Sequence, residues 1–288
     1  MLENLQRRCV FVPGDSFPKQ VASKVMDVAG IVLNGGELLP PFSMRRIIGE
    51  SRWQLRGQDF KAQGNHFVQK LTQDAGLRPD SQVLDLGSGC GRIALPLTKI
   101  LNSTGAYWGL EPMESLVKWC RKRITPSFSN FQFQHCDIYN KLYNKIGKIR
   151  PEDFKLPFNS NQFDLIVATS VFTHLTTEAV KNYAAECSRV LKQGGRLFAS
   201  FFLLESGTCS HDGGINFSCI LEPGVSRVID PTVPEKAIAY SSDWLLSILS
   251  SQNMQLIPPI RWGCWTGRQP AYSGQDVLIL EKNLTSRH

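Results

Sequence analysis

One stretch, residues 82–97, constrains the fold of this chain most. It reads QVLDLGSGCGRIALPL: an apolar run interrupted by Asp85, then glycines at alternate positions (Gly87, Gly89 and Gly91), then an apolar pattern that can continue as a helix. Glycines remove side chains from a turn, and the start of a helix presents unpaired N–H groups to a bound molecule. The stretch therefore predicts a strand, a tight turn and a helix, as in parallel α/β sheets that bind a ligand against bare backbone.

The spacing of the glycines bears on which ligand is bound. A dinucleotide-binding turn has glycine at its first, third and sixth positions. Counted from Gly87, the sixth position is Arg92, so this pattern is not met. Asp85 also places a carboxylate at the end of the strand, where it would repel a pyrophosphate and attract an ammonium group. A ligand with an amino-acid end fits better.

A second carboxylate follows the next apolar run of the sequence. The apolar run 106–110 ends at Glu111, which lies 20 residues beyond Gly91. A carboxylate at the end of a second parallel strand, about 20 residues after the turn, can hold a ribose diol through paired hydrogen bonds.

With these features the sequence resembles the class I S-adenosylmethionine-dependent methyltransferases, over roughly residues 62–283. The family's first motif is an acidic residue followed by a Gly-x-Gly-x-Gly turn. The resemblance implies S-adenosylmethionine as cofactor, S-adenosylhomocysteine as product and no metal. It places Glu111 on the ribose, Asp137 near the adenine amino group and Ile138 on the adenine ring. The cofactor-binding residues expected from it are Asp85, Gly87, Ser88, Gly89, Gly91, Glu111, Pro112, Met113, Asp137, Ile138, Thr169 and Ser170.

The fold that this resemblance implies is α/β: a Rossmann-like, mostly parallel sheet of seven strands in the order 3-2-1-4-5-7-6, with helices on both faces. We expect an N-terminal helical lid (1–61), a methyltransferase domain (62–283) with an insertion at 204–239, and a tail (284–288). The insertion should contain a hairpin around Glu222-Pro223-Gly224. The expected helices are 66–75, 115–123, 177–191 and 242–251, and later strands are 196–203, 255–262 and 276–281.

Candidate catalytic residues follow from the chemistry of a sulfonium, whose methyl group is already electrophilic. Alignment alone can supply about 7–11 kcal/mol, so a base is helpful and not obligatory. His174, four residues after the predicted fourth strand, is one candidate base, and His211 on the insertion is another. A purely structural role is the alternative for each. Aromatic residues that could line an acceptor pocket, or could equally serve in packing, are Phe60, Phe172, Trp262, Trp265 and Tyr272.

The acceptor class is narrowed by signatures that the sequence lacks. The fourth strand ends in TSVF, which is neither the Asn/Asp-Pro-Pro-aromatic signature of exocyclic-amine methylation in DNA nor a Pro-Cys nucleophile. The paired glutamates of arginine-methylating enzymes are also missing. We therefore expect a small-molecule acceptor with an oxygen or nitrogen nucleophile, such as a natural product of secondary metabolism.

The net charge of +7 leaves two other hypotheses open. Residues 118–155 contain nine basic and three acidic residues, which could form a surface for RNA or protein methylation. However, Trp119 is the single aromatic residue among the basic residues at 118–123, fewer than a base-stacking platform would need, so a solvated surface and no nucleic-acid partner is the preferred interpretation. A cofactor-binding protein without turnover is the third hypothesis.

Cysteines and apolar runs bear on metal binding and location. None of the eight cysteines forms a Cys-x-x-Cys pair, and Cys209 with His211 lacks a second pair to complete a zinc site. No run approaches the roughly 20 apolar residues of a membrane span. The sequence predicts a soluble cytoplasmic protein without a membrane partner, and it leaves the oligomeric state open.

Overall fold

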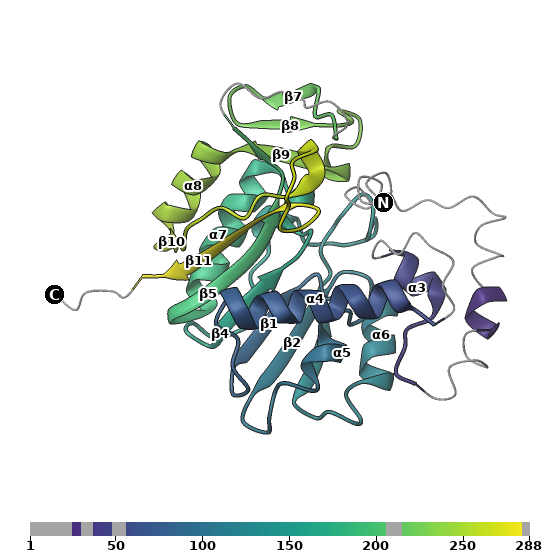
Figure 1. Ribbon diagram of the computed structural model, residues 1–288. Coiled ribbons are helices and arrows are strands. Elements are labelled where there is room, and N and C mark those ends of the chain that lie inside the picture. Colours follow the sequence, from purple (N-terminus) through teal and green to yellow (C-terminus); the bar gives the residue numbers. More distant parts are fainter. Residues whose placement is uncertain (1–24, 30–36, 48–55, 206–214, 284–288) are drawn as a thin grey trace.

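A seven-stranded sheet forms the centre of the protein in this computed structural model, which describes residues 25–29, 37–47, 56–205 and 215–283 (Figure 1). The strand order is β10-β11-β5-β4-β1-β2-β3. Strand β11 is antiparallel to β5 and to β10, and the other pairs are parallel. This confirms the expected fold class and the order 3-2-1-4-5-7-6. The strands are β1 Gln82–Leu86, β2 Ala106–Glu111, β3 Phe131–His135, β4 Phe163–Ala168, β5 Leu191–Phe201, β10 Met254–Leu256 and β11 Asp276–Lys282.

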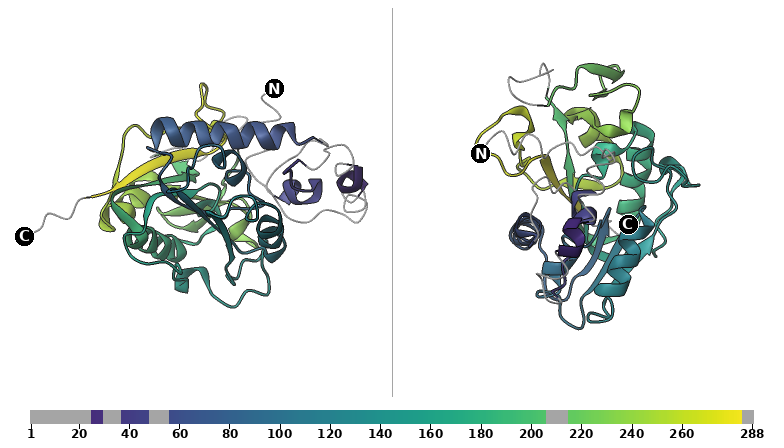
Figure 2. Two further views of the ribbon diagram at one scale, coloured as in Figure 1. Left: turned by 90° about the horizontal axis from the view of Figure 1, so that it is seen from below. Right: turned by 90° about the vertical axis from the view of Figure 1, so that its right-hand side faces the viewer.

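Helices cover both faces of this sheet (Figure 2). Successive side chains of a strand point to opposite faces, so Val83 of β1 packs with the helices α4, α5 and α6, and its neighbour Leu84 packs with α7 and α8. Both faces are apolar because both are covered, as is typical of parallel sheets. The helices are α3 Phe42–Ile47, α4 Gln58–Asp74, α5 Ala94–Leu97, α6 Glu114–Arg123, α7 Thr177–Val190 and α8 Ser242–Ser251.

Three element boundaries differ from the sequence-based expectations. Helix α4 begins at Gln58 and not at His66, so the domain boundary expected at residue 61 falls within a helix. Helix α7 ends at Val190 and residues 191–201 form β5, where the pairing with β4 slips and accommodates the two glycines inside the strand. Strand β10 ends at Leu256 because the prolines that follow cannot donate ladder hydrogen bonds.

A second, four-stranded sheet that the sequence did not predict extends from the end of β5 (Figure 1). Its order is β6-β9-β8-β7, and its antiparallel pair β7–β8 is the expected hairpin of the insertion. A small aromatic core supports it, with Phe202, Phe217 and Trp265 ring centroids 5.0–5.5 Å apart. The strands are β6 Leu203–Leu204, β7 Cys219–Glu222, β8 Ser226–Val228 and β9 Ile238–Ser241.

Part of the expected N-terminal lid can be placed. Residues 25–29 are helical, and Ser43 of α3 binds Asp27 through its amide (2.9 Å) and its hydroxyl (2.7 Å). The remaining positions of the lid, other than 37–47 and 56–61, lie outside the described residues, as does the tail 284–288. Within the described ranges no helix has both the length and the apolar character to cross a bilayer.

Candidate functional site

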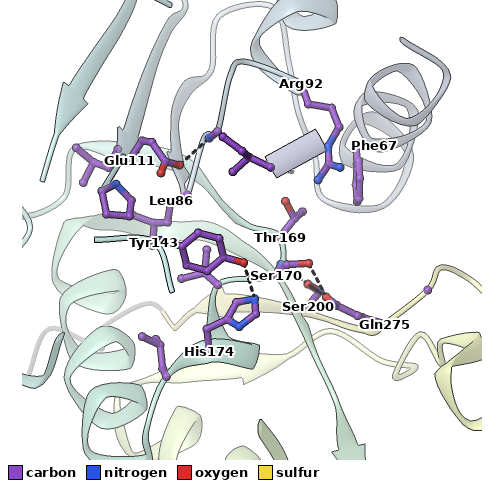
Figure 3. Close-up of a pocket in the computed structure, with 18 of the residues that line it drawn as sticks. Phe67, Leu86, Arg92, Glu111, Tyr143, Thr169, Ser170, His174, Ser200 and Gln275 are labelled. Carbon is purple, nitrogen blue, oxygen red and sulfur yellow. Dashed lines mark hydrogen bonds between the residues drawn. The ribbon is translucent and has the colours of Figure 1, made fainter. Parts of the chain in front are cut away.

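A cavity of about 530 Å³ opens where the carboxyl ends of β1, β2, β4 and β5 meet (Figure 3). Leu86, Glu111, Thr169 and Ser200 each line it from a different one of these strand ends. In open α/β sheets this edge is the usual place for ligands. The volume lies within the range of about 300–1,000 Å³ that is common for small-molecule sites.

The glycine turn forms one border of the cavity. Gly87 and Gly89 have φ angles of +68° and +56°, and both line the cavity. A Cβ atom on Gly87 would lie 2.8 Å from a methyl carbon of Val171, which also lines it. Gly91 faces away, and its Cβ would meet Ile124 at 2.8 Å. A side chain at Gly87 would thus meet Val171 at the cavity, whereas the absence of one at Gly91 permits close packing beneath the turn.

Glu111 holds the turn in place at one end of the cavity. Its carboxylate oxygens accept hydrogen bonds of 2.9 Å from the backbone amides of Gly89 and Met113. Burial raises the pKa of Glu111 to about 7, although both backbone bonds act in the opposite direction. Each oxygen has further acceptor capacity, which suits a diol. The apolar side chains around Glu111 that could enclose a flat ring are Leu110, Pro112, Met113, Leu116 and Ile138.

Asp85 lies behind the main cavity. With Ser88 and Thr169 it lines an adjoining pocket of about 20 Å³, which is large enough for one water molecule. Burial raises the pKa of Asp85 to about 7. Its Oδ1 and the Ser88 hydroxyl are buried and have no hydrogen-bond partner in the described part of the chain. Oδ1 of Asp85 and the hydroxyl of Ser88 can therefore each form a further hydrogen bond next to the glycine turn.

Two serines orient an amide at the ends of β4 and β5. Ser170 adopts a left-handed backbone (φ 58°), and its amide donates to the Ser200 hydroxyl at 2.7 Å. The hydroxyls of Ser170 and Ser200 donate to Oε1 of Gln275, at 3.0 and 2.6 Å. A left-handed non-glycine residue is uncommon and is often found at functional sites. Gln275 lines the cavity with its amide oxygen already engaged, so its amide nitrogen is the group suited to binding a ligand.

His174 lies at the other end of the cavity from Glu111 (Figure 3). Its Nδ1 is 2.7 Å from the backbone oxygen of Glu235, and its Nε2 is 3.5 Å from the hydroxyl of Tyr143. Because a carbonyl oxygen only accepts, Nδ1 carries the proton and Nε2 is the acceptor. Burial lowers the pKa of His174 below its ordinary value. The imidazole is therefore neutral near pH 7 and able to accept a proton.

Helix α4 and the segment 269–275 form the wall above the turn. Arg92 lies 5.4 Å from the ring centre of Phe67 and donates to Gln63 Oε1 at 3.1 Å, and all three residues line the cavity. Lys70 donates to the backbone oxygen of Tyr272 and lies 3.8 Å from the centre of its ring. The second pair ties α4 to the loop that closes this side of the site.

The predicted site residues that the structure describes fall into three groups. Those that line the main cavity are Gly87, Gly89, Glu111, Pro112, Met113, Ile138, Thr169, Ser170, His174 and Tyr272. Asp85 and Ser88 line only the adjoining pocket. Those outside both linings are Gly91, Asp137, Phe60, Phe172, Trp262 and Trp265. His211 lies outside the described residues.

The aromatic side chains outside the cavity have packing partners. Phe60 packs in a small cluster with Cys90 and Leu116. Phe172 lies 4.9 Å from Phe201, measured between ring centres.

The two tryptophans are likewise engaged away from the cavity. The Trp262 ring lies 4.3 Å from the Arg268 guanidinium. Trp265 donates to Asp276 at 2.6 Å, and Asp276 also accepts from the amides of Leu203 and Gly263. Trp265 is therefore part of the link between the two sheets.

Several cavity residues were missed by the sequence analysis. Tyr143 and Phe154 come from the long segment between β3 and β4, part of the basic region for which a solvated surface was expected. Its unusual length was the available signal, because long loops often carry function. Gln275, in contrast, follows no motif and reaches the site only because β11 pairs with β5.

Residues 84–199 match the family model described as a methyltransferase domain. The matched part of the chain is a methyltransferase domain, in agreement with the resemblance to the class I S-adenosylmethionine-dependent methyltransferases. This match supports S-adenosylmethionine as the cofactor, as that resemblance implies. Among the residues that the structure describes, no group of three or more His, Cys, Asp or Glu side chains is arranged to hold a metal ion.

Curated relatives of the methyltransferase domain include enzymes of quinone biosynthesis. The Ubiquinone/menaquinone biosynthesis C-methyltransferase UbiE of Wigglesworthia glossinidia brevipalpis is 31% identical over 141 residues, which is 48% of this chain and 50% of that protein. The UbiE protein of Bordetella parapertussis is 31% identical over 147 residues, 50% of each chain. The chain thus spans about half the length of the curated relatives it matches.

A solved structure agrees with the fold of the methyltransferase domain. The PH0226 protein from Pyrococcus horikoshii OT3 superposes with a TM-score of 0.51 at 13% identity, covering 79% of this chain and 93% of that one. At this identity the similarity concerns the fold alone.

Proposed function

We propose that the protein transfers the methyl group of S-adenosylmethionine to an oxygen or nitrogen atom of a small organic acceptor. The observation that carries this proposal is the continuity of one cavity from Glu111 to His174. The Glu111 end offers acceptors for a ribose and apolar surface for a base. The His174 end offers a proton acceptor within an apolar enclosure.

Residues along the cavity would hold the cofactor in sequence. Glu111 would bind the ribose diol, and Ile138 would pack on the adenine. Asp137 as the partner of the adenine amino group stays a prediction, since its side chain is outside the cavity lining. The bare backbone of Gly87 and Gly89 would accommodate the methionine part.

The charged ends of the methionine part also have suitable partners. The guanidinium of Arg92 lines the cavity and suits a carboxylate. Asp85 has an unused oxygen in the adjoining pocket, and one water there would link it to an ammonium group. The cofactor supplies a methyl group that is already electrophilic, so these residues contribute mainly by positioning it.

A second candidate function is methyl transfer to carbon. The curated relatives are named C-methyltransferases. A neutral His174 next to the acceptor would suit removal of a proton from carbon as well as from oxygen. Fragmentation of the methylated product in a mass spectrometer separates the two, because a methyl group on carbon stays with the carbon skeleton.

The RNA or protein alternative has less support from the basic segment 118–155. Lys118 pairs with Glu114 at 2.9 Å, Arg150 pairs with Glu152, and Arg121 donates to the backbone oxygen of Phe133. Part of the charge is therefore already engaged within the protein. Labelled methyl transfer into an acid-precipitable RNA or protein fraction, with none into small molecules, would contradict the small-molecule proposal.

Calorimetric titration with S-adenosylmethionine tests the cofactor site. Glu111→Ala should weaken binding about 10- to 100-fold, because it removes two hydrogen bonds to the ribose and the backbone support of the turn. The matched control is Glu114→Ala, which removes an exposed carboxylate on the next helix and should bind as the unmodified protein does. Equal affinity of the Glu111 variant would refute the ribose assignment.

A further inference from the structure

Two hydrogen bonds in series connect the cavity to the insertion. The first joins the hydroxyl of Tyr143 to Nε2 of His174, at 3.5 Å, and the second joins Nδ1 of His174 to the backbone oxygen of Glu235, at 2.7 Å. The three residues come from the segment after β3, from the short helix η2 (Phe172–His174) and from the short helix η3 (Pro234–Lys236). Figure 3 shows the Tyr143 hydroxyl pointing at the imidazole.

The backbone oxygen of Glu235, at the end of the series, determines which group donates in each of the two hydrogen bonds. A backbone carbonyl can only accept, so Nδ1 of His174 is the protonated nitrogen and Nε2 has a free lone pair. The Tyr143 hydroxyl must then be the donor to Nε2. Its oxygen keeps lone-pair capacity for a further hydrogen bond from a ligand in the cavity.

Tyr143 therefore borders the cavity and contacts the histidine at the same time. Its hydroxyl lies 3.5 Å from Nε2, and the two rings meet edge to face with centroids 5.5 Å apart. A ligand that donates a hydrogen bond to Nε2 directly would compete with this hydroxyl for the single lone pair of that nitrogen. The Tyr143 oxygen therefore offers a proton a route from the cavity to Nε2.

The surroundings of the pair are apolar. Val171, Leu175, Phe154 and Tyr183 line the same cavity. Burial lowers the pKa of His174 and raises the pKa of Tyr143, so both are neutral near pH 7. An apolar molecule with one hydroxyl group would bury its body here and find in Tyr143 a partner for that hydroxyl.

We propose that Tyr143 is a catalytic residue that binds the hydroxyl of an apolar acceptor, such as a phenol, and relays its proton to His174. The inference rests on the proposed function and names its acceptor class. As the acceptor oxygen forms its bond to the methyl carbon, the carbon–sulfur bond breaks and its electron pair stays on sulfur. The acceptor proton moves to the Tyr143 oxygen, and the Tyr143 proton moves to Nε2. One positive charge passes from sulfonium to imidazolium, so charge is conserved.

The first experiment examines the hydrogen bond between Tyr143 and His174 in the absence of catalysis. It records ¹⁵N NMR of the histidine ring nitrogens. His174→Gln identifies the His174 signals. We expect an Nδ1-protonated neutral ring, with an Nε2 resonance that shifts in Tyr143→Phe because that variant removes the donor. A protonated Nε2 in the unmodified protein, or an Nε2 resonance unchanged in the variant, would overturn the relay.

The second experiment uses 4-nitrophenol as a chromophoric probe of the acceptor site, in protein saturated with S-adenosylhomocysteine. Tyr143→Phe should weaken its binding about tenfold, since it removes one hydrogen bond in an apolar site. Tyr139→Phe is the control, because Tyr139 lies in the same segment, is 40% exposed and does not line the cavity. It should bind the probe as the unmodified protein does.

The outcomes separate this inference from the proposed function. If S-adenosylhomocysteine binds to all variants equally but 4-nitrophenol does not bind, or binds equally well to Tyr143→Phe, the inference fails and the proposed function stands. If S-adenosylhomocysteine itself does not bind to the unmodified protein, the proposed function fails. Equal thermal unfolding midpoints for the two Tyr→Phe variants show that lost probe binding does not come from lost structure.

Discussion

The hydroxyl of Tyr107 on β2 donates a hydrogen bond of 2.6 Å to the carboxylate of Asp85 on β1, and both side chains are buried. This bond partly offsets the effect of burial, which raises the pKa of Asp85. It also fixes the carboxylate so that its other oxygen has no partner among the described residues. The acidic residue of the glycine motif is therefore positioned by a tyrosine that belongs to no motif.

Replacing Tyr107 by Phe should weaken both folding and cofactor binding. The variant leaves a buried carboxylate oxygen without its donor, which costs about 1–3 kcal/mol of unfolding free energy in urea denaturation. It should also raise the pKa of Asp85 further and lower the affinity for S-adenosylmethionine in calorimetry. Tyr139→Phe, at an exposed position, serves as the control. Unaltered values in the Tyr107 variant would show that the bond has no energetic role.

Cofactor affinity should rise with pH between about 6 and 8. Burial raises the pKa values of Asp85 and Glu111 to about 7, so both carboxyl groups become charged across this range in the ligand-free protein. A ligand with a sulfonium and an ammonium group favours the charged forms, and binding should release protons. Titrations in buffers of different ionisation enthalpy measure that release. Proton uptake on binding would contradict the prediction.

The stability of the ligand-free protein should change with pH in the opposite sense. Asp85 and Glu111 have higher pKa values in the folded state than the ordinary values of 3.8 and 4.5, so the folded state binds more protons above those values. The unfolding free energy should therefore fall as pH rises from about 4 towards 7. Asp85→Asn and Glu111→Gln should each flatten the profile measured by urea denaturation, and a parallel profile would refute the assignment.

Gly64→Ala should destabilise the protein although alanine favours helices. Gly64 lies within α4, and a Cβ atom there would come within 2.3 Å of the backbone oxygen of Arg92. Alanine gains about 1 kcal/mol in helix propensity, but this overlap pushes α4 away from the glycine turn, at a cost of about 1–3 kcal/mol or more. Asn65→Ala, one position along at an exposed site, should be neutral or slightly stabilising. Thermal unfolding compares the two.

Lys70 and Tyr272 should be energetically coupled. Lys70 binds both the backbone oxygen and the ring face of Tyr272, and burial lowers the pKa of Lys70 to about 8. A double-mutant cycle with Lys70→Met and Tyr272→Leu should give a coupling free energy of about 1 kcal/mol in unfolding. Strictly additive effects would show that the contact does not fasten the loop to α4.

The sequence alone determined the features that depend on short stretches of chain. The strand, turn and helix of residues 82–97 and the carboxylate of Glu111 follow from spacing, because a glycine turn and a strand end are local structures. The strand order came from the resemblance that these motifs carry. The hairpin of the insertion was likewise predicted from turn residues next to one another.

The tertiary structure alone decided which distant polar groups meet at the site. Tyr143, His174 and Glu235 form one series although they are 31 and 61 positions apart, and Gln275 reaches Ser170 across 105 positions. Periodicity shows which side chains are buried and not which buried groups become neighbours. The same ambiguity explains Trp262 and Trp265, since an aromatic residue that packs between sheets has the same local pattern as one that lines a pocket.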